Sequence, residues 1–371
     1  MHKTTNGLEW NFFVPFGRAT GYEGIIDRLD CYDPKEIKEL PKQERIDKAN
    51  ELVRIIREID VFPIYYLSKE AIVAEIMNCM FEDVSFTGKT LDVQSSVGNT
   101  LLDFLFPGLH LANAAGSANN SMYDRFYDDT KLAKCLYSYM SAYPFKSVRT
   151  MFFMYGRLHW PTATGFTPMR AKAIYERFCK DGFVVYDSSA GYGGRMLGAL
   201  TCNKNIKYVC CEPNTETYIS LNKLYDAVNE TKRMFNIEPS ICEIHNCGSE
   251  DLKLPSAYVD FAFTCPPYYN LERYCNEPTQ SIIKFKKYDV WLEGFVRPTL
   301  RNTYNALKPH ASMCLVLGNI RSTNNKFYPL IDDWSRIAKE EGFTFVDTYA
   351  IKTRSRKNTE DLERLLHFIK E

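Results

Sequence analysis

The sequence predicts an α/β fold in which a doubly wound, mostly parallel sheet follows a largely helical N-terminal domain. From Pro161 onward, short apolar strand patterns alternate with helical patterns as far as the C-terminus, which is the element order of a parallel sheet covered by helices. Before Pro161, apolar residues recur mainly at helical spacing. A length of 371 residues suits two domains. We therefore expect a mainly helical domain at 1–160, a candidate for target recognition, and a sheet domain at 161–371.

The composition is that of an ordinary globular chain. Hydrophobic residues make up 45% and charged residues 25% of the sequence. Lys+Arg and Asp+Glu both total 46, so binding to a nucleic acid would require a local basic patch. No apolar run reaches the ~18 residues of a membrane span, and the N-terminus lacks a signal-peptide pattern. We therefore expect a cytoplasmic protein without a membrane partner.

The cysteines point to reduced thiols rather than to a metal site. Twelve of them are scattered without CxxC pairs, which fits mostly buried, unpaired side chains. Cys242, His245 and Cys247 are close enough in the sequence for a zinc site. No second pair with ligand spacing accompanies them, so we predict no metal.

The N-terminal domain contains three helical regions. Pro41 can occupy the first turn of a helix that continues to Ile59. Ser68 is an N-cap candidate for a second helix, and residues 129–157 look helical again. The turn-rich stretch 86–121 can cover a pocket or form an irregular connection, and we favour the irregular connection.

The sheet domain opens with a helix and a strand that ends in an acid. Thr167 is the expected N-cap of the helix and Pro168 its first helical residue. Residues 183–186 form the first strand, which ends at Asp187. The turn 188–194 then carries three glycines, which let a ligand approach the backbone closely before the next helix begins.

The next two strands carry further polar residues at the same edge. The second strand, 208–211, ends in Glu212, 25 residues past Asp187. An acid at this place is suited to bind a ribose diol. A third strand near 241–245 leads to Ser249 and Glu250, which can meet an adenine edge or cap a helix, and the sequence does not choose between these roles. The pattern predicts a cofactor that contains a nucleoside.

The fourth strand ends in the most distinctive motif of the chain. Residues 259–263 are apolar except for Asp260, and Cys265, Pro266, Pro267 and Tyr268 follow one residue later. Two consecutive prolines fix φ and remove two backbone donors, so the chain leaves the sheet in a stiff, extended turn. A planar base can stack on Tyr268 while its amino group donates to the Pro266 carbonyl and to the side chain of Cys265. A rigid loop that merely ends the strand is the alternative.

Basic residues near the C-terminal half form two candidate phosphate-binding segments. The first interleaves basic and aromatic residues, which suits phosphate contact and base stacking but also a solvated loop. The second follows the late strand at 343–349. The nucleic-acid-binding candidates in these segments are Lys284, Lys286, Lys287, Arg354, Arg356 and Lys357.

Taken together, these motifs resemble the S-adenosylmethionine-dependent amino-methyltransferases that act on DNA bases. The family's cofactor loop resembles residues 187–194, with Asp187, Ser188, Ala190, Gly191 and Gly193 as the positions that correspond. Its catalytic motif, Asp, Asn or Ser followed by Pro-Pro-Tyr or Phe, resembles residues 265–268. The resemblance covers about 161–350 and implies a Rossmann-like methyltransferase domain with the cofactor motif ahead of the catalytic one.

The resemblance also assigns roles to single residues. It implies that Thr167 and Pro168 contact S-adenosylmethionine, that Glu212 holds its ribose, and that Ser249 and Glu250 lie near its adenine. The implied activity is transfer of a methyl group to cytosine N4 or adenine N6 of DNA, which is the setting of DNA methylation and restriction-modification. The chain departs from the family at Cys265, because a thiol is a weak acceptor.

Several alternatives remain open at this stage. RNA amino-methyltransferases use similar Pro-Pro-Tyr turns. Cys265 can also be read as a nucleophile on a pyrimidine ring, as in carbon-5 methyltransferases, although those have Pro-Cys where this chain has Cys-Pro. A non-catalytic binding protein would explain the weak acceptor at 265. A nicotinamide dehydrogenase would explain the glycine-rich turn but not the prolines.

Overall fold

The computed structural model describes most of the chain as two compact units. The described residues are 3–4, 7–8, 34–59, 62–64, 67–114, 120–140, 148–321, 325–352 and 363–371. The first unit comprises Met1–Ser68 and Pro107–Thr164, and the second comprises Lys69–Phe106 and Gly165–Glu371.

The first unit is mainly helical. Its helices are α2 (Pro34–Glu39), α3 (Lys42–Ile59), the 3-10 helix Pro107–Leu111, α6 (Met122–Phe126), α7 (Asp129–Met140) and α8 (Val148–His159). Its strands are β1 (Lys3–Thr4), β2 (Gly7–Leu8) and β4 (Asn113–Ala114). The core gathers aromatic rings around Phe62, which is fully buried and lies 5.4 Å from Phe126 and 6.1 Å from Phe152 between ring centroids. Tyr139 of α7 is also buried in this core.

The second unit is built on an eight-stranded sheet with the order β3-β13-β14-β10-β8-β5-β6-β7. Its strands are β3 (Thr90–Leu91), β5 (Val184–Asp187), β6 (Lys207–Cys211), β7 (Ile241–His245), β8 (Val259–Thr264), β10 (Leu307–Leu317), β13 (Phe343–Ile351) and β14 (Arg364–Lys370). Short strands outside this sheet are β9 (Glu272–Arg273), β11 (Ile320–Arg321) and β12 (Phe327–Tyr328). Within the eight-stranded sheet, the described ladders are parallel except the two that β14 makes with β10 and β13. The predicted doubly wound, mostly parallel sheet is confirmed.

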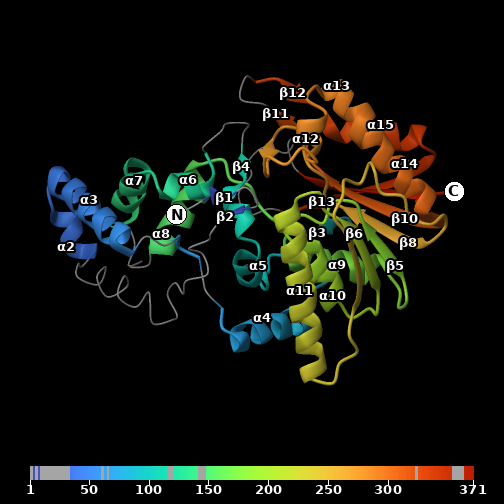
Figure 1. The fold of residues 1–371 in the computed structure, drawn as a ribbon, viewed down its shortest axis with the longest axis horizontal. Coiled ribbons are helices and arrows are strands. Elements are labelled where there is room, and N and C mark those ends of the chain that lie inside the picture. Colours follow the sequence, from blue (N-terminus) through green and yellow to red (C-terminus); the bar gives the residue numbers. More distant parts are fainter. Residues whose placement is uncertain are drawn as a thin grey trace. The chain divides into compact units, whose positions relative to one another are not determined.

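Helices cover both faces of this sheet (Figure 1). One face carries α9 (Pro168–Phe178), α10 (Gly194–Thr201) and α11 (Thr215–Met234), and the other carries α14 (Arg297–Ala306) and α15 (Leu330–Glu340). The remaining helices of the unit are α4 (Lys69–Phe81), α5 (Asn99–Leu105), α12 (Ser281–Lys284) and α13 (Tyr288–Trp291). Crossover helices on both faces are what parallel strands require.

Residues 69–106 pack with the sheet unit, whereas the sequence analysis placed them within the N-terminal domain. Both α4 and α5 contact α11, and α4 also contacts α10. The buried Lys172 of α9 donates to the carbonyls of Cys79, Met80 and Glu82 at 2.8–2.9 Å. These carbonyls belong to the end of α4, where a cation is favoured. One side chain thus anchors an earlier helix to the sheet domain.

The parallel strands place three turns at one edge of the sheet. β5 pairs with β6 on one side and with β8 on the other, both in parallel register. The turns that follow these three strands therefore lie side by side at their carboxyl ends. Asp260 supports this register from within β8, because its carboxylate accepts from the backbone N–H of Val184 at 2.9 Å and pairs with Lys308.

Two segments have features that were not predicted from the sequence. The stretch 86–121 is not entirely irregular, since Asn99–Leu105 is helical and begins after Gly98, whose φ is 84°. The helical region from α13 to α14 contains a π-helical segment, Leu292–Val296. Pro298 follows this segment, and its missing N–H and its ring displace the preceding turn of the helix.

Candidate active site

The turn after β5 is held by a buried ion pair. Asp187 is fully buried and accepts from Arg195 Nε at 2.7 Å, from the Tyr208 hydroxyl at 2.6 Å and from the Ser189 N–H at 3.1 Å. Arg195 also donates to the Ser189 carbonyl. Asp187 and Arg195 thus both hydrogen-bond to the backbone of the turn at Ser189. Removal of either partner would leave an uncompensated buried charge.

Glycines allow this turn to pass close to its neighbours. Gly193 has a φ of 73° and begins α10 in the left-handed region, which favours glycine. A Cβ on Gly194 would lie 1.7 Å from the Phe166 carbonyl oxygen. Gly191 differs, because a Cβ there would meet nothing nearer than the Ser189 carbonyl oxygen at 3.8 Å. The backbone at Gly191 therefore borders open space that a ligand can occupy.

The segment before α9 lies against α10. Thr167 is the N-cap of α9, without a side-chain capping bond, and Pro168 is in its first turn, as predicted. A Cβ on Gly198 would lie 2.6 Å from the Pro168 carbonyl oxygen. The two helices therefore pack backbone to backbone beside the glycine-rich turn.

Glu212 connects the turn after β5 to the turn after β6. Its carboxylate accepts from the Gly191 N–H at 3.0 Å and from the Asn214 N–H at 2.9 Å. The side chain is 8% exposed, and burial raises its pKa to about 7 even though both N–H groups favour the carboxylate. The adjacent Ala190 N–H donates to the Cys211 carbonyl at 3.0 Å, which fixes the spacing of the two turns.

The turn after β7 brings the predicted adenine-side residues next to a predicted nucleic-acid contact. Ser249 is buried, with its hydroxyl 2.7 Å from that of Thr299 on α14. Glu250 pairs with Lys284 Nζ through Oε1 at 2.5 Å, and Lys284 also pairs with Asp251 at 2.8 Å. Within the described residues, Glu250 Oε2 is buried and has no hydrogen-bond partner. A buried acceptor of this kind remains available for a hydrogen bond from a water molecule, an ion or a ligand.

The Cys-Pro-Pro-Tyr turn separates its two tyrosines. Tyr269 has a φ of 48°, a left-handed conformation that reverses the chain. Its ring is buried against Tyr288, Trp291 and Tyr328, at centroid distances of 5.1–5.5 Å. Tyr268 stays half-buried at the sheet edge. Tyr269 is thus buried within the core cluster, whereas Tyr268 is only partly buried and packs against that cluster.

The hydroxyl of Tyr268 is held at the sheet edge. It lies 3.4 Å from the Val316 carbonyl oxygen, 3.3 Å from Glu363 Oε1 and 3.7 Å from Cys265 Sγ. Burial raises the pKa of Tyr268 well above its ordinary value, so the phenol is neutral. A ring with a fixed hydroxyl presents its face in one orientation, which suits stacking on a planar ligand.

Cys265 is a neutral thiol in this site. Burial, and next the charge of Glu363, raise its pKa to about 12, although the Arg195 guanidinium acts in the opposite direction. The thiolate is the nucleophilic form of cysteine. The environment of Cys265 therefore favours a weak hydrogen-bonding group over a nucleophile.

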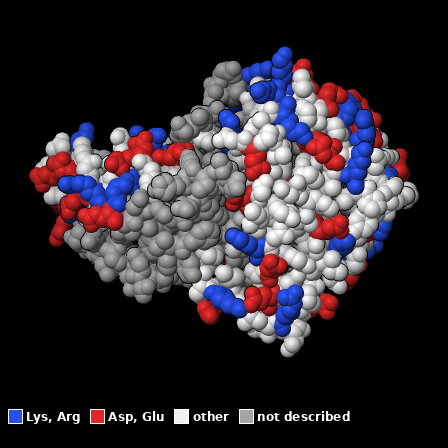
Figure 2. Space-filling model, viewed as in Figure 1, with Lys and Arg blue, Asp and Glu red and all other residues white. Residues whose placement is uncertain are grey.

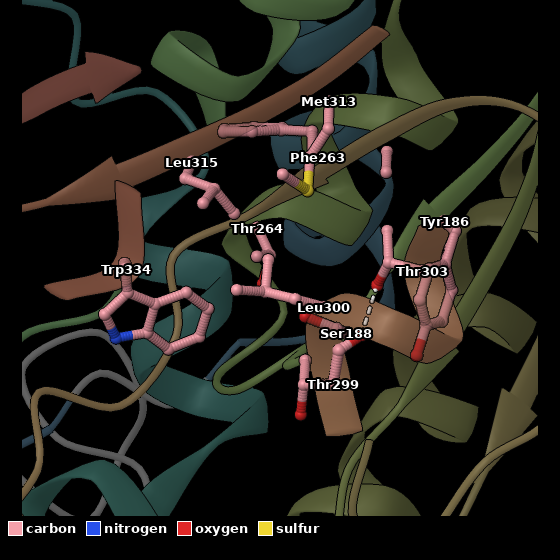
Figure 3. A pocket seen from close by; sticks show the side chains of 11 residues that line it. Tyr186, Ser188, Phe263, Thr264, Thr299, Leu300, Thr303, Met313, Leu315 and Trp334 are labelled. Carbon is pink, nitrogen blue, oxygen red and sulfur yellow. Dashed lines mark hydrogen bonds between the residues drawn. The ribbon is translucent and has the colours of Figure 1, made fainter. Parts of the chain in front are cut away.

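The glycine-rich turn and the Pro-Pro turn border one another. Ser188, after β5, and Thr264, just before Cys265, both line a narrow cavity of about 10 Å³ beneath the edge (Figure 3). Its other walls include Leu315 and Trp334. This volume has room for about one water molecule, so a larger ligand would have to occupy the edge itself.

A segment that follows the Pro-Pro turn folds back across the first two turns. We call Asn270–Gln280 the strap. The ring of Tyr274 lies 6.0 Å from that of Tyr192 in the glycine-rich turn. Glu277 accepts from the N–H of Thr215 at 3.2 Å, and Thr279 donates to the Pro213 carbonyl at 3.1 Å. The buried Tyr192 hydroxyl has no hydrogen-bond partner within the part of the chain that the structure describes. The strap thus joins the motifs that the sequence assigned to base and cofactor.

Exposed basic residues lie beside the aromatic cluster of Tyr269, Tyr288, Trp291 and Tyr328, which we call the aromatic anchor. Lys286 and Lys287 are exposed and precede α13, and the Lys286 carbonyl accepts from the Tyr269 hydroxyl at 2.8 Å. The β11–β12 hairpin adds Arg321, whose guanidinium lies 4.9 Å from the ring centroid of the exposed Phe327. Figure 2 shows blue side chains at the top of the view, where Figure 1 places α13, β11 and β12. We call Lys286, Lys287, Arg321 and Phe327 the basic surface.

Some candidates cannot be placed, and others fall outside any cluster. Arg354, Arg356 and Lys357 lie outside the described residues. The described residues contain no group of three or more His, Cys, Asp and Glu side chains arranged to hold a metal, so Cys242, His245 and Cys247 form no such group. No described helix combines the length and the apolar character needed to cross a bilayer.

Sequence reasoning missed several residues that shape the site. These are Tyr192, Arg195, Tyr208, Glu277, Arg321 and Glu363. Arg195 directly follows the glycines, and an arginine at the start of a buried helix could have indicated an acidic partner. The sequence has no local signal for Glu363, because its contact with Tyr268 spans 95 positions.

Comparison with known proteins gives similarity to solved structures alone. No family model matches the chain, and no curated protein matches it. A methyltransferase from Pyrococcus furiosus is 16% identical over 55% of this chain and 83% of its own, with a TM-score of 0.34. A SAM-dependent methyltransferase from Methanosarcina mazei is 12% identical over 53% of this chain and 96% of its own, with a TM-score of 0.37.

A third similar structure is the 1,6-didemethyltoxoflavin-N1-methyltransferase from Burkholderia thailandensis with bound 1,6-didemethyltoxoflavin and S-adenosylhomocysteine. Its identity is 14% over 54% of this chain and 76% of its own, with a TM-score of 0.36. Similarity at this level gives no basis for transferring an activity, so the function of this chain has to be argued from its own residues.

Proposed function

We propose that the chain transfers a methyl group from S-adenosylmethionine to the exocyclic amino group of a DNA base, either cytosine N4 or adenine N6. The observation that carries the proposal is the shared edge of β5, β6 and β8, where a glycine-rich turn, a buried acid and a Pro-Pro-Tyr turn meet. Each part serves a different step: cofactor binding, ribose binding and base stacking.

The residues of the first three turns fit S-adenosylmethionine. The open backbone at Gly191 admits a close approach, and the Glu212 carboxylate, which follows β6 at this edge, would accept from ribose hydroxyls. Glu250 Oε2, which has no partner among the described residues, offers an acceptor for an adenine amino group. When bound, this cofactor supplies an electrophilic methyl group on a sulfonium. The chain itself supplies the positions of the reacting groups.

The Pro-Pro-Tyr turn fits a flipped base. Extrusion of the base from a duplex costs a few kcal/mol, and stacking on an aromatic ring returns about 1–3 kcal/mol. Tyr268, with its hydroxyl held at the edge, offers the stacking face. The Pro266 carbonyl accepts from the amino group and directs the nitrogen lone pair toward the methyl group. Positioning of this kind can supply most of the rate enhancement in an in-line transfer.

The basic surface supports a nucleic-acid partner despite the zero net charge of the chain. Lys286 and Lys287 directly precede Tyr288, a member of the aromatic anchor that follows Tyr268. Arg321 and Phe327 come from another hairpin beside the same anchor, since Tyr328 lies 4.8 Å from Tyr288 between ring centroids. Cations with an exposed ring among them suit phosphates that flank an extruded base.

The state of Cys265 bears on the carbon-5 alternative. Attack on a pyrimidine ring needs a thiolate, and a pKa of about 12 keeps this thiol protonated near neutrality. Amino-group methylation does not need the thiolate. A protonated thiol at Cys265 therefore favours the amino group over ring carbon as the acceptor of the methyl group.

The experiment that tests the proposal is a methyl-transfer assay with tritiated cofactor and either DNA or RNA. We expect transfer to DNA, and nucleoside mass spectrometry of the product would identify the modified base. Tyr268→Ala should abolish transfer while cofactor binding, followed by calorimetry, stays intact. Transfer to RNA alone would refute the choice of DNA, and cofactor binding without transfer to either would refute the enzyme assignment.

A further inference from the structure

The Glu363 carboxylate lies near Cys265, the position at which the proposed site has only a weak hydrogen-bond acceptor. Glu363 directly precedes β14, and its Oε1 lies 3.3 Å from the Tyr268 hydroxyl. The same hydroxyl is 3.7 Å from Cys265 Sγ. Thiol, phenol and carboxylate therefore form a continuous line at the edge where the amino group of a stacked base would lie.

The backbone at Arg364 and at Gly318 places the Glu363 side chain beside the end of β10. Arg364 is in register with Leu317 at the end of β10. A Cβ on Gly318 would lie 3.4 Å from Glu363 Cγ, so a glycine leaves room for the side chain. Glu363 is half-buried, which keeps its carboxylate at the site instead of free in solvent.

Other charged and titratable groups face the same place. The charges of Arg195 on α10, Glu272 in the strap and Glu363 all influence the pKa of Cys265. Tyr274 of the strap also interacts electrostatically with Cys265. Arg195 is already paired with the buried Asp187. The Tyr274 hydroxyl donates to Glu272 at 2.6 Å. Glu363 is the acid of this set that contacts Tyr268.

We propose that Glu363 is the hydrogen-bond acceptor and proton acceptor for the target amino group. This inference rests on the proposed function. The family that the motif resembles has Asp, Asn or Ser at position 265, whereas a thiol accepts weakly. A carboxylate arriving from β14 supplies the missing strong acceptor, and charge-assisted hydrogen bonds are about twice as strong as neutral ones.

The reaction is balanced with this assignment. The amino nitrogen uses its lone pair to form a bond to the methyl carbon, and the carbon–sulfur bond breaks with its electron pair going to sulfur. The methylated nitrogen then carries one proton too many. That proton passes to the Glu363 carboxylate, which releases it to solvent after the base leaves.

The decisive experiment combines Glu363→Gln with Cys265→Asp. Glu363→Gln keeps size and hydrogen bonding but removes the charge, and we expect kcat to fall about 100-fold, within the range for a lost acid–base group. Cys265→Asp in the Glu363→Gln background should recover at least about tenfold, because it restores a carboxylate that can accept a proton. Glu238→Gln, an exposed acid in the connection before β7, is the matched control and should leave kcat unchanged.

A binding measurement without turnover gives a second readout. Oligonucleotides with the target base, and with the same base lacking its amino group, are compared by fluorescence anisotropy in the presence of S-adenosylhomocysteine. The unmodified protein should prefer the amino-containing base about tenfold or more, and Glu363→Leu, which has no acceptor, should lose this preference. An unchanged preference in Glu363→Leu, or a loss of kcat in Glu363→Gln that Cys265→Asp does not recover, would overturn the role of Glu363. No methyl transfer by the unmodified protein would instead refute the proposed function.

Discussion

Glu212 gives the sharpest test of the cofactor site, because its ionisation should control cofactor binding. In the ligand-free protein, burial raises the pKa of this carboxyl to about 7 from an ordinary 4.5. Ribose hydroxyls donate to a carboxylate, so binding requires the ionised form. Below pH 7 part of the binding energy is therefore used to remove a proton.

The magnitude follows from this pKa. Each tenfold change in proton affinity is worth about 1.4 kcal/mol, so a return of the pKa to its ordinary value on binding corresponds to roughly 3 kcal/mol. The affinity for S-adenosylhomocysteine should therefore rise about tenfold per pH unit between pH 5 and 7 and level off above pH 7. Glu212→Gln should remove this slope and weaken binding at pH 8 about 10- to 100-fold, as expected for lost hydrogen bonds to a charged group.

The stability of the ligand-free protein should change in the opposite direction. Between pH 4.5 and 7 the folded state binds more protons at Glu212 than the unfolded state does, since its folded pKa is raised to about 7. The stabilisation that the Glu212 carboxyl group gives to the folded state is fully present below pH 4.5 and is lost as the pH rises through 7. Urea unfolding should thus give Glu212→Gln an advantage that grows from pH 5 to pH 8.

Isothermal titration calorimetry at several pH values measures the binding profile, and Glu238→Gln is the control at an exposed site. Calorimetry in buffers of different ionisation enthalpy should also detect release of a proton on binding at pH 6. A flat affinity profile for the unmodified protein, or the same slope in Glu212→Gln, would refute the assignment of this acid to the ribose.

Three further predictions concern other parts of the site. Tyr268→Phe should keep the stacking face and lose the hydroxyl, so we expect kcat to fall no more than about tenfold, whereas Tyr268→Ala should abolish transfer; equal losses would contradict stacking. Arg321→Ala should reduce the slope of log Kd against log salt for duplex DNA by about 0.9. Lys180→Ala, at the opposite edge of the sheet, is the control and should leave this slope unchanged. An unchanged slope for Arg321→Ala would exclude the hairpin from phosphate contact. Arg195→Leu should lower the free energy of unfolding by about 3–5 kcal/mol, because it leaves Asp187 buried without its partner. Urea unfolding would measure this change. A loss under about 1 kcal/mol would show that other groups compensate the charge of Asp187.

Parallel strands made much of the sheet predictable. The strands at 183–186, 208–211 and 259–263 are short, mainly apolar runs that are each followed by a polar or turn residue, and β5, β6 and β8 occupy these positions. Because such strands share one direction, their ends meet at one edge, and the neighbouring positions of the turns at Asp187, Glu212 and Cys265 followed from strand order alone. Local chemistry was sufficient here.

Other features depended on contacts that no local pattern records. Tyr268 and Tyr269 look equivalent in the sequence, but the left-handed backbone at Tyr269 buries one ring and leaves the other at the edge. Lys284 looked like a phosphate ligand, whereas it pairs with Glu250 and Asp251 from the turn after β7. A charge within a polar loop does not reveal its partner when that partner is more than 30 residues away.

The direction of β14 explains why the sequence concealed Glu363. A parallel strand delivers its last residue to the carboxyl edge of the sheet, and searching the ends of strands found the acids at 187 and 212. β14 runs antiparallel to both β10 and β13, so its first residues reach that edge instead. Glu363, directly ahead of Arg364, therefore lies beside a turn that ends β8, although it precedes its own strand. A sheet with one inserted antiparallel strand can thus supply a strong acceptor from the far end of the chain, which would release position 265 from the need to provide one.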